Sequence, residues 1–259
     1  MDQMVNLSPV QFMYRSFGLH FALAVALSAA SHWQRKEANL MCCRSPDGVS
    51  WVTIKQDSMK SYLALGDSYT TAEGAESNDC FPVQTVSLLN AASVQFSDPE
   101  VVAQTGWTTA DLLAALDHRR NAKRSYDVVS LLIGVNNQFQ ARSREEYRLE
   151  FTSLLGKAVD LAGRRRSRVF VLSIPDYSVT PYGRQSGRAA SISKEIDVFN
   201  EINKSISRSL GLHYLDVTTE SRMAANDPGL VASDGLHFSA KEYLRWADML
   251  SRQIKAALE

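Results

Sequence analysis

The chain has 259 residues, of which 45% are hydrophobic, and its 28 Lys and Arg residues balance its 28 Asp and Glu residues. This composition predicts a globular protein with a buried core, and a net charge of zero excludes nucleic-acid binding through an overall positive charge. The three cysteines have neither the paired spacing of a zinc site nor that of a disulfide framework, so the sequence predicts neither.

Residues 1–58 differ from the rest of the chain, and we interpret them as an N-terminal extension. Within it, residues 16–30 (SFGLHFALAVALSAA) resemble the hydrophobic region of a secretion signal, but they are too short for a stable membrane span, which needs about 20 apolar residues. Residues 31–58 show no clear periodicity and are interpreted as a linker. A mis-assigned start upstream of Met59 is the alternative. The protein is exported under the first hypothesis and cytoplasmic under the second, so the localisation stays open.

Residues 59–259 form the second predicted domain, in which short apolar runs alternate with longer segments of helical period. This alternation predicts an α/β fold with a parallel sheet, because each crossover between parallel strands needs a helix that covers one face. The expected strands are Tyr62–Leu65, Glu100–Gln104, Asp127–Ile133, Arg168–Ile174 and His213–Val217. The expected helices are Pro82–Ala92, Thr108–Leu116, Arg144–Leu161, Ile192–Leu210 and Ala240–Ala257.

A polar cluster that contains Ser68 follows the first expected strand, in the stretch LALGDSYTTAEG. Gly106 follows the second expected strand, GVNN (134–137) follows the third, and DGLH (234–237) precedes the last helix. The carboxyl ends of the strands in a parallel α/β sheet face the ligand crevice. We therefore expect these four polar segments to lie on one rim of the sheet.

Ser68 needs a neighbouring base before it can act as a nucleophile, because a serine hydroxyl is a poor nucleophile at neutral pH. Of the five histidines, only His237 lies in a loop with an acid at a short fixed spacing, in SDGLHFSAKEY. Asp234 is then able to accept the proton on one ring nitrogen while the other nitrogen faces Ser68. The alternative is that Asp234 caps a helix and His237 is a packed surface residue.

An acyl-transfer transition state also needs hydrogen-bond donors for its oxyanion. The backbone N–H groups of Ser68 and Gly106 and the side-chain amide of Asn136 are the candidates. Glycine permits a close approach because it has no side chain. Taken singly, Gly106 and Asn136 are also typical of ordinary turns.

These residues lie in four short blocks: GDSY at Ser68, TGWT at Gly106, GVNN at Asn136 and DGLH at His237. The blocks and their order resemble those of the SGNH hydrolases, also called GDSL esterases or lipases. The resemblance covers residues 59–259. It implies a flavodoxin-like three-layer α/β/α sandwich with a five-stranded parallel sheet in the order 2-1-3-4-5. It also implies Ser68 as nucleophile, His237 as base, Asp234 as its partner, an oxyanion hole of Ser68, Gly106 and Asn136, and neither a metal nor an organic cofactor.

Three residues depart from the family's pattern: Tyr69 replaces the leucine of GDSL, Asn137 replaces an aspartate, and Phe238 replaces a proline. Asn137 is able to pin its loop as a neutral hydrogen-bonding residue, whereas any role that needs a carboxylate there is in doubt. Ordinary packing is the alternative for the aromatic residues near the motifs. The residues predicted to surround the substrate are Asp67, Tyr69, Trp107, Asn137, Tyr177 and Phe238.

The sequence thus predicts a serine esterase that hydrolyses a small-molecule, glycan or lipid ester through an acyl-enzyme. A non-catalytic glycan- or lipid-binding module on the same fold is the alternative. A haloacid-dehalogenase-type phosphatase is excluded because it needs a second aspartate where Tyr69 stands. GDSYT also lacks the second glycine of the GxSxG elbow of α/β-hydrolases.

Overall fold

The computed structural model describes residues 40–45, 48–53, 59–119 and 125–259. The chain divides into two units, residues 1–56 and residues 57–259.

The N-terminal unit contains an antiparallel hairpin of β1 (Leu40–Ser45) and β2 (Gly48–Thr53). This finding differs from the linker expected for residues 31–58. β2 contains three β-branched residues, Val49, Val52 and Thr53, which are typical of strands, whereas β1 (LMCCRS) contains none, so only half of the hairpin shows a strand signal in the sequence. The signal-like segment 16–30 lies outside the described residues.

The larger unit is built on a five-stranded sheet in which every neighbouring pair of strands is parallel. Its spatial order is β4-β3-β5-β6-β7, which is 2-1-3-4-5 when the strands of this unit are counted along the chain. The expected fold class and strand order are confirmed. The strands are β3 (Tyr62–Gly66), β4 (Glu100–Ala103), β5 (Val128–Leu132), β6 (Val169–Leu172) and β7 (His213–Leu215).

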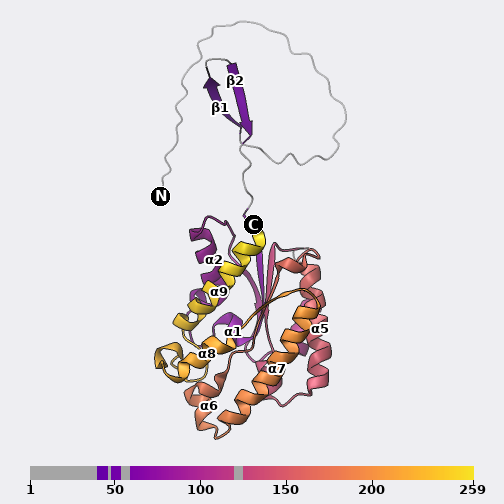
Figure 1. Cartoon of the computed structure of the whole chain (residues 1–259), viewed down its shortest axis with the longest axis vertical. Coiled ribbons are helices and arrows are strands. Elements are labelled where there is room, and N and C mark those ends of the chain that lie inside the picture. The colour runs from indigo at the N-terminus through magenta and orange to yellow at the C-terminus, as the bar shows by residue number, and fades with distance from the viewer. Residues whose placement is uncertain (1–39, 46–47, 54–58, 120–124) are drawn as a thin grey trace, which may run out of the picture. The chain divides into compact units, whose positions relative to one another are not determined.

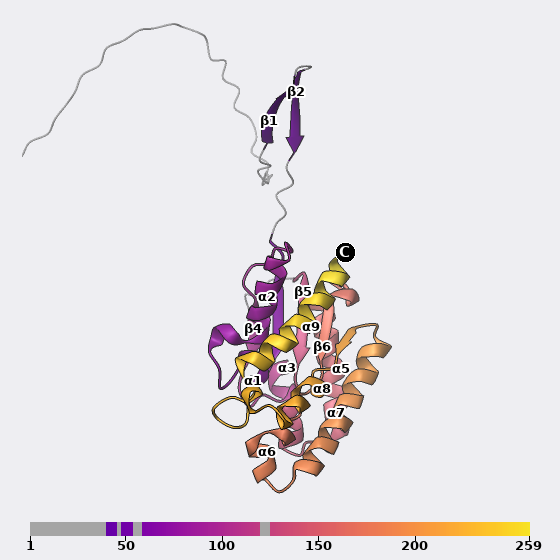
Figure 2. The ribbon, with the colours of Figure 1, turned by 60° about the vertical axis from the view of Figure 1, so that its left-hand side comes forward.

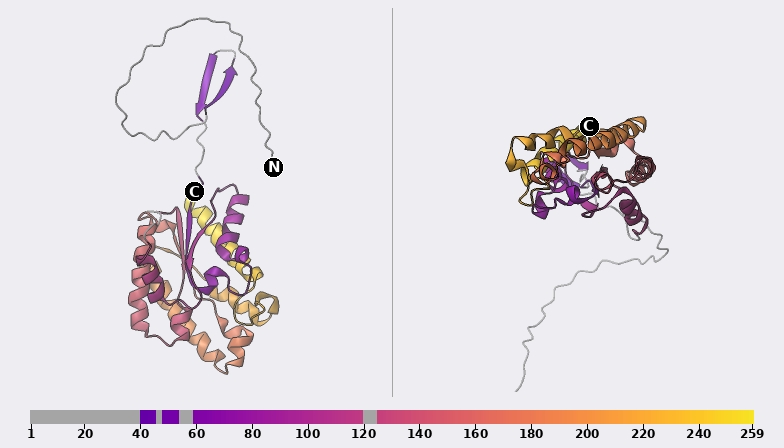
Figure 3. Two further views of the ribbon diagram at one scale, coloured as in Figure 1. Left: turned by 180° about the vertical axis from the view of Figure 1, so that it is seen from behind. Right: turned by 90° about the horizontal axis from the view of Figure 1, so that it is seen from below.

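Helices cover both faces of this sheet, as Figures 1 and 3 show. On one face α2 (Phe81–Ala91) packs against α9 (Ala240–Leu258). On the other face α3 (Thr109–Asp117) contacts α5 (Arg144–Leu161), which in turn contacts α7 (Ala189–Ser209). These long helices lie where the apolar periodicity predicted them, with ends shifted by at most a few residues because helix ends fray and are set by local capping.

Several short elements lie among the long helices and were not predicted, since one turn is too short to show an apolar period. Figure 2 shows α1, α6 and α8 gathered towards the carboxyl ends of the strands. No helix in the described part of the chain is long and apolar enough to span a membrane. The short α-helices are α1 (Ser68–Thr71), α4 (Val135–Phe139), α6 (Pro181–Gln185) and α8 (Thr218–Ser221). The 3-10 helices are η1 (Ser77–Asp79), η2 (Arg166–Arg168), η3 (Tyr177–Val179), η4 (Arg222–Ala225) and η5 (Pro228–Leu230).

The buried side of α9 carries a carboxyl group, that of Glu242, whose side chain is fully buried. The indole N–H of Trp246 donates to Glu242 Oε1 over 2.7 Å, and Arg245 Nε lies 3.6 Å from Oε2. Burial raises the pKa of Glu242 to about 7, and the hydrogen bond from Trp246 and the charge of Arg245 offset only part of this effect.

Replacing this carboxyl group by an amide is therefore expected to stabilise the protein in a pH-dependent way. Because the pKa of Glu242 is higher in the folded state, the wild type loses stability as the pH rises from about 4.5 through 7. The Glu242→Gln variant keeps an acceptor for Trp246 and avoids this loss, so its advantage grows to at most about 3 kcal/mol above pH 7. Urea unfolding of both proteins between pH 4 and 8 measures the difference, and a difference that does not change with pH contradicts the assignment.

Candidate active site

Gly66 ends β3 at a point where the chain passes very close to its neighbours. A Cβ atom added at Gly66 would lie 2.4 Å from the carbonyl oxygen of Leu132 on β5 and 2.0 Å from Thr70 Oγ1. Both separations are shorter than any van der Waals contact, so only glycine fits at this position. The glycine of the GDSY block is thus explained by packing at the start of the loop.

Asp67 and Ser68 form the start of α1, immediately after this glycine. The carboxylate of Asp67 caps the helix by accepting the backbone N–H of Tyr69 over 3.1 Å. Burial raises the pKa of Asp67 to about 7, although backbone hydrogen bonds, including one from Gly134, offset part of this rise. Asp67 was predicted to surround the substrate, but it is fully buried and does not line the pocket beside Ser68; its side chain caps the helix that begins with Ser68.

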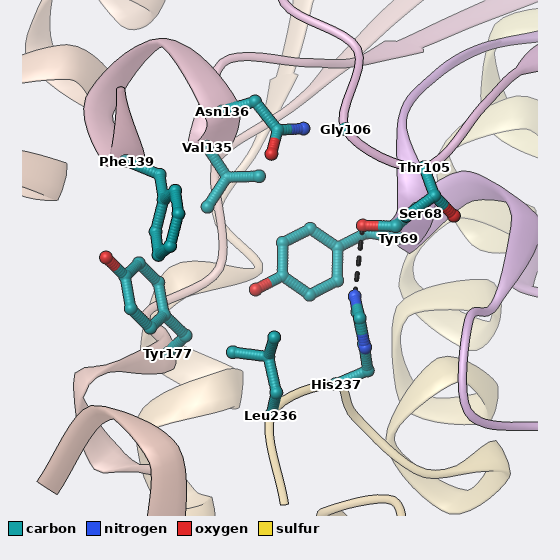
Figure 4. Close-up of a pocket in the computed structure, with 10 residues that line it drawn as sticks. All are labelled: Ser68, Tyr69, Thr105, Gly106, Val135, Asn136, Phe139, Tyr177, Leu236 and His237. Atoms are coloured by element: carbon teal, nitrogen blue, oxygen red, sulfur yellow. Dashed lines mark hydrogen bonds between the residues drawn. The ribbon is translucent and has the colours of Figure 1, made fainter. Parts of the chain in front are cut away.

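The DGLH loop presents His237 to Ser68. Asp234 Oδ2 lies 2.6 Å from His237 Nδ1. His237 Nε2 lies 3.1 Å from Ser68 Oγ, the hydrogen bond that is dashed in Figure 4. The other oxygen of Asp234 accepts the backbone N–H groups of Leu236 and His237 over 2.8 and 2.9 Å. An acid, an imidazole and a hydroxyl are therefore connected in series, which is the geometry needed to draw a proton from a serine.

The electrostatics of Asp234 suit this arrangement. Burial alone would raise its pKa, but the hydrogen bonds from the His237 ring and from the two backbone N–H groups outweigh burial and lower the pKa below its ordinary value. Asp234 is therefore a carboxylate at neutral pH and is able to accept the Nδ1 proton of the ring. That bond leaves Nε2 of a neutral His237 without a proton and facing the hydroxyl.

Gly106 and Asn136 lie beside Ser68 in the wall of one pocket (Figure 4). Gly106 has a φ of 84°, which a residue with a Cβ rarely adopts. Asn136 Nδ2 donates one hydrogen to the carbonyl oxygen of Trp107 over 2.9 Å, and an amide nitrogen carries two. The structure thus brings together the three residues that were predicted to supply oxyanion donors, although they come from three different strand ends.

The pocket itself is small, with a volume of about 140 Å³. Ser68 and His237 lie together on one side of it, and the side chains of Val135, Phe139, Tyr177 and Leu236 lie on the other (Figure 4). The phenol of Tyr177 donates to Gln138 Oε1 over 3.1 Å, which fixes this ring in the wall. The lining residues are Ser68, Tyr69, Thr105, Gly106, Val135, Asn136, Phe139, Tyr177, Leu236 and His237.

Among the residues predicted to surround the substrate, only Tyr69 and Tyr177 line this pocket, and their contact with a substrate stays a prediction. Trp107 is half-buried against the core and contributes a carbonyl oxygen to Asn136 instead. Asn137 and Phe238 do not line this pocket. Asn137 is buried and bonds to Thr109, whereas Phe238 is fully buried and packs against Tyr69 and Trp246.

Gly74, which lies next to Asp234, was not predicted as a site residue. Gly74 has a φ of 82°, and a Cβ atom there would lie 2.9 Å from Asp234 Oδ2 and 3.0 Å from Ala232 Cβ. The sequence did contain an indication of its importance, because Gly74 is the second glycine of the LALGDSYTTAEG stretch that contains Ser68. Four pocket residues were not predicted either, because nothing in an isolated loop sequence separates a pocket wall from the core: Thr105, Val135, Phe139 and Leu236.

The side chains of the described ranges form no group of three or more His, Cys, Asp or Glu residues that could hold a metal ion.

Residues 64–245 match the model of the GDSL-like Lipase/Acylhydrolase family. No significant match to a curated protein was found.

Among solved structures, similar folds include a lipase/acylhydrolase from Enterococcus faecalis (20% identity, TM-score 0.60, covering 76% of this chain and 96% of that chain). They also include Axe2, an acetylxylan esterase from Geobacillus stearothermophilus (19% identity, TM-score 0.58, covering 78% and 96%). A third is the psychrotrophic esterase EstA from Pseudoalteromonas sp. (19% identity, TM-score 0.53, covering 77% and 98%). At these identities the likeness shows the fold alone.

The contact between Gly74 and Asp234 leads to a prediction that needs no substrate. In Gly74→Ala the added Cβ displaces the carboxylate and weakens its hydrogen bonds, so the pKa of Asp234 rises towards its ordinary value. Gly211→Ala is the matched control, because Gly211 also has a positive φ, 68°, but nothing lies within 4 Å of its added Cβ. Both variants are expected to lose about 1–3 kcal/mol of stability through backbone strain. Carbon-13 NMR titration of the Asp234 carboxyl group measures the pKa, and equal values in the two variants contradict the prediction.

Proposed function

Because the chain belongs to the GDSL-like lipase/acylhydrolase family, we propose that it is a serine esterase that hydrolyses carboxylic esters through an acyl-enzyme. Membership of the family supports a hydrolase that acts on esters, and the assignment of single residues to steps is our proposal. The observation that carries it is the connected series from Asp234 Oδ2 to His237 Nδ1, 2.6 Å, and from His237 Nε2 to Ser68 Oγ, 3.1 Å.

In the first step Ser68 Oγ attacks the ester carbonyl carbon while Nε2 of neutral His237 accepts the hydroxyl proton. Asp234 stabilises the imidazolium that forms, because its carboxylate already accepts the Nδ1 proton. His237 then donates the acquired proton to the leaving alcohol as the tetrahedral intermediate collapses. A water molecule repeats the sequence on the acyl-enzyme and releases the acid.

The negative charge of the tetrahedral intermediate is stabilised by the backbone N–H groups of Ser68 and Gly106 and by Nδ2 of Asn136. Removal of one such donor typically costs about 3 to 4 kcal/mol of transition-state stabilisation. The bond from Asn136 to the carbonyl of Trp107 supports this role, because it holds the amide while one N–H stays available.

The size of the pocket supports a short acyl chain. An apolar cavity of about 150 Å³ in another protein binds benzene, a six-carbon ring. The pocket beside Ser68, at about 140 Å³, therefore suits an acyl group of roughly two to six carbons. The acetylxylan esterase with a similar fold makes an acetylated glycan one candidate within this class.

The alternative of a non-catalytic binding module has no specific observation in its favour. Such a module is expected when a member of the triad is absent or turned away. Here all three are present, and His237 lies within hydrogen-bond distance of both Asp234 and Ser68.

Removal of the Ser68 hydroxyl is expected to abolish hydrolysis of p-nitrophenyl acetate. Ser68→Ala should lower kcat by about 10⁴-fold or more, because the nucleophile is absent. Ser153→Ala is the control, since Ser153 is an exposed residue of α5 that lies outside the pocket, and it should keep wild-type activity. Equal hydrolysis by Ser68→Ala and the wild type would falsify the catalytic assignment.

A series of p-nitrophenyl esters from two to twelve acyl carbons tests the pocket. The wild type should show its highest kcat/KM at about two to six carbons. Leu236→Ala removes a pocket wall and should shift the preference towards chains longer by about two to three carbons, whereas Leu244→Ala, an exposed residue of α9, should leave it unchanged. An unshifted preference in Leu236→Ala, with the esterase activity intact, rejects the acyl pocket and retains the catalytic assignment.

A further inference from the structure

Asn137, the neighbour of the proposed oxyanion donor Asn136, is bonded at both ends of its amide to a single residue. Its Oδ1 accepts the backbone N–H of Thr109 over 3.0 Å, and its Nδ2 donates to Thr109 Oγ1 over 2.7 Å. Thr109 is fully buried, and the side chain of Asn137 is almost so. Since a backbone N–H only donates, Oδ1 must face it, and the orientation of the amide follows.

The hydroxyl of Thr109 makes one more hydrogen bond, to Glu150 Oε2 on α5. A threonine hydroxyl has one hydrogen to donate, and an ionised carboxylate only accepts. Thr109 accepts from Asn137 and must therefore donate to Glu150. The three side chains form a chain of hydrogen bonds in which every donor points the same way, from the Asn137 amide to the Thr109 hydroxyl and from that hydroxyl to the Glu150 carboxylate.

This chain of hydrogen bonds joins two segments that the sheet does not join directly. Gly106 follows β4 and Asn136 follows β5, and in the sheet β3 lies between those two strands. Asn137 bonds to Thr109 twice, and Asn136 Nδ2 bonds to the carbonyl oxygen of Trp107. These three hydrogen bonds connect the segment that carries Gly106 to the helix that carries Asn136.

We propose that Glu150, acting through Thr109 and Asn137, is a positioning residue that sets the distance between the oxyanion donors Gly106 and Asn136. The inference rests on the proposed function, because it concerns the donors of that reaction. Glu150 lies on α5 and is not part of the pocket wall, so it touches neither the ester nor Ser68. It acts by accepting the Thr109 hydroxyl proton, which leaves that hydroxyl as the acceptor for Asn137 at the start of α3, three residues after Gly106.

The proposal is tested by reversing the direction of this chain. Asn137→Asp replaces the donating amide by a second acceptor, so two carboxylates compete for the one hydrogen of Thr109. This variant should lower kcat about 10- to 100-fold and leave KM within about 3-fold, because donors that are misplaced by a fraction of an ångström lose transition-state binding. Adding Glu150→Gln supplies an amide that donates to Thr109, whose hydroxyl then donates to the new carboxylate. The double variant should recover kcat to within about 5-fold of the wild type.

Asn137→Asp combined with Glu145→Gln is the matched control. Glu145 lies on the same helix but is exposed, so this change removes the same charge without touching Thr109 and should restore nothing. A second pair covers the case in which Asn137→Asp does not fold. Thr109→Val removes the hydroxyl and should lower kcat about 10-fold or more, whereas Thr109→Ser keeps the hydroxyl and most of the activity.

Suppose that the wild type is active but that adding Glu150→Gln to Asn137→Asp restores no more activity than adding Glu145→Gln. This result overturns the inference and leaves the proposed function unaffected. Equal kcat in Thr109→Val and Thr109→Ser overturns it in the same way. A folded wild type without any esterase activity overturns the proposed function, and this inference with it.

Discussion

The register of the three neighbouring strands β4, β3 and β5 is the constraint on which the site depends. Gly66 at the end of β3 is paired with Ala103 on one side and with Leu132 on the other. The loops that carry Ser68, Gly106 and Asn136 therefore leave the sheet at the same level. A glycine at position 66 is needed because β3 and β5 approach too closely there for any side chain. The close approach of β3 and β5 at Gly66 thus determines both how the strands pack and where the Ser68 hydroxyl lies.

Two carboxyl groups lie near Ser68, those of Asp67 and Asp234, and their surroundings shift their pKa values in opposite directions. Burial raises the pKa of Asp67 to about 7, so its contribution to stability is present at acid pH and is lost as the pH rises through 7. The hydrogen bonds of Asp234 lower its pKa in spite of partial burial, so its contribution is present at neutral pH and is lost as the pH falls through that lowered pKa. Only Asp234 is thus a stable anion at neutral pH, and only Asp234 faces the imidazole.

Much of this architecture was predictable from residue patterns, and the exceptions have physical causes. The central strands are short continuous apolar runs and the long helices show an apolar period of 3.6 residues, and the helix expected at Arg144–Leu161 has those bounds. Leu236 and Phe238 show the limit: both are apolar residues of one loop, yet Leu236 lines the pocket and Phe238 is core. An irregular loop has no period that assigns side chains to faces, so tertiary packing decides. The same holds for Gly74, whose role depends on a carboxylate remote in sequence.

The short helix α4 shows how such packing defines a site. A helix of one turn is not stable alone, because nucleation costs more than one turn of hydrogen bonds returns. Successive residues of a helix point about 100° apart, so its three consecutive amide side chains reach different neighbours. Asn136 bonds to Trp107, Asn137 to Thr109, and Gln138 both to Glu195 on α7 over 2.6 Å and to Tyr177. The same bonds that hold α4 also fix one proposed oxyanion donor and one wall of the pocket. Stability of the rim and geometry of the reaction centre are therefore properties of the same few amides.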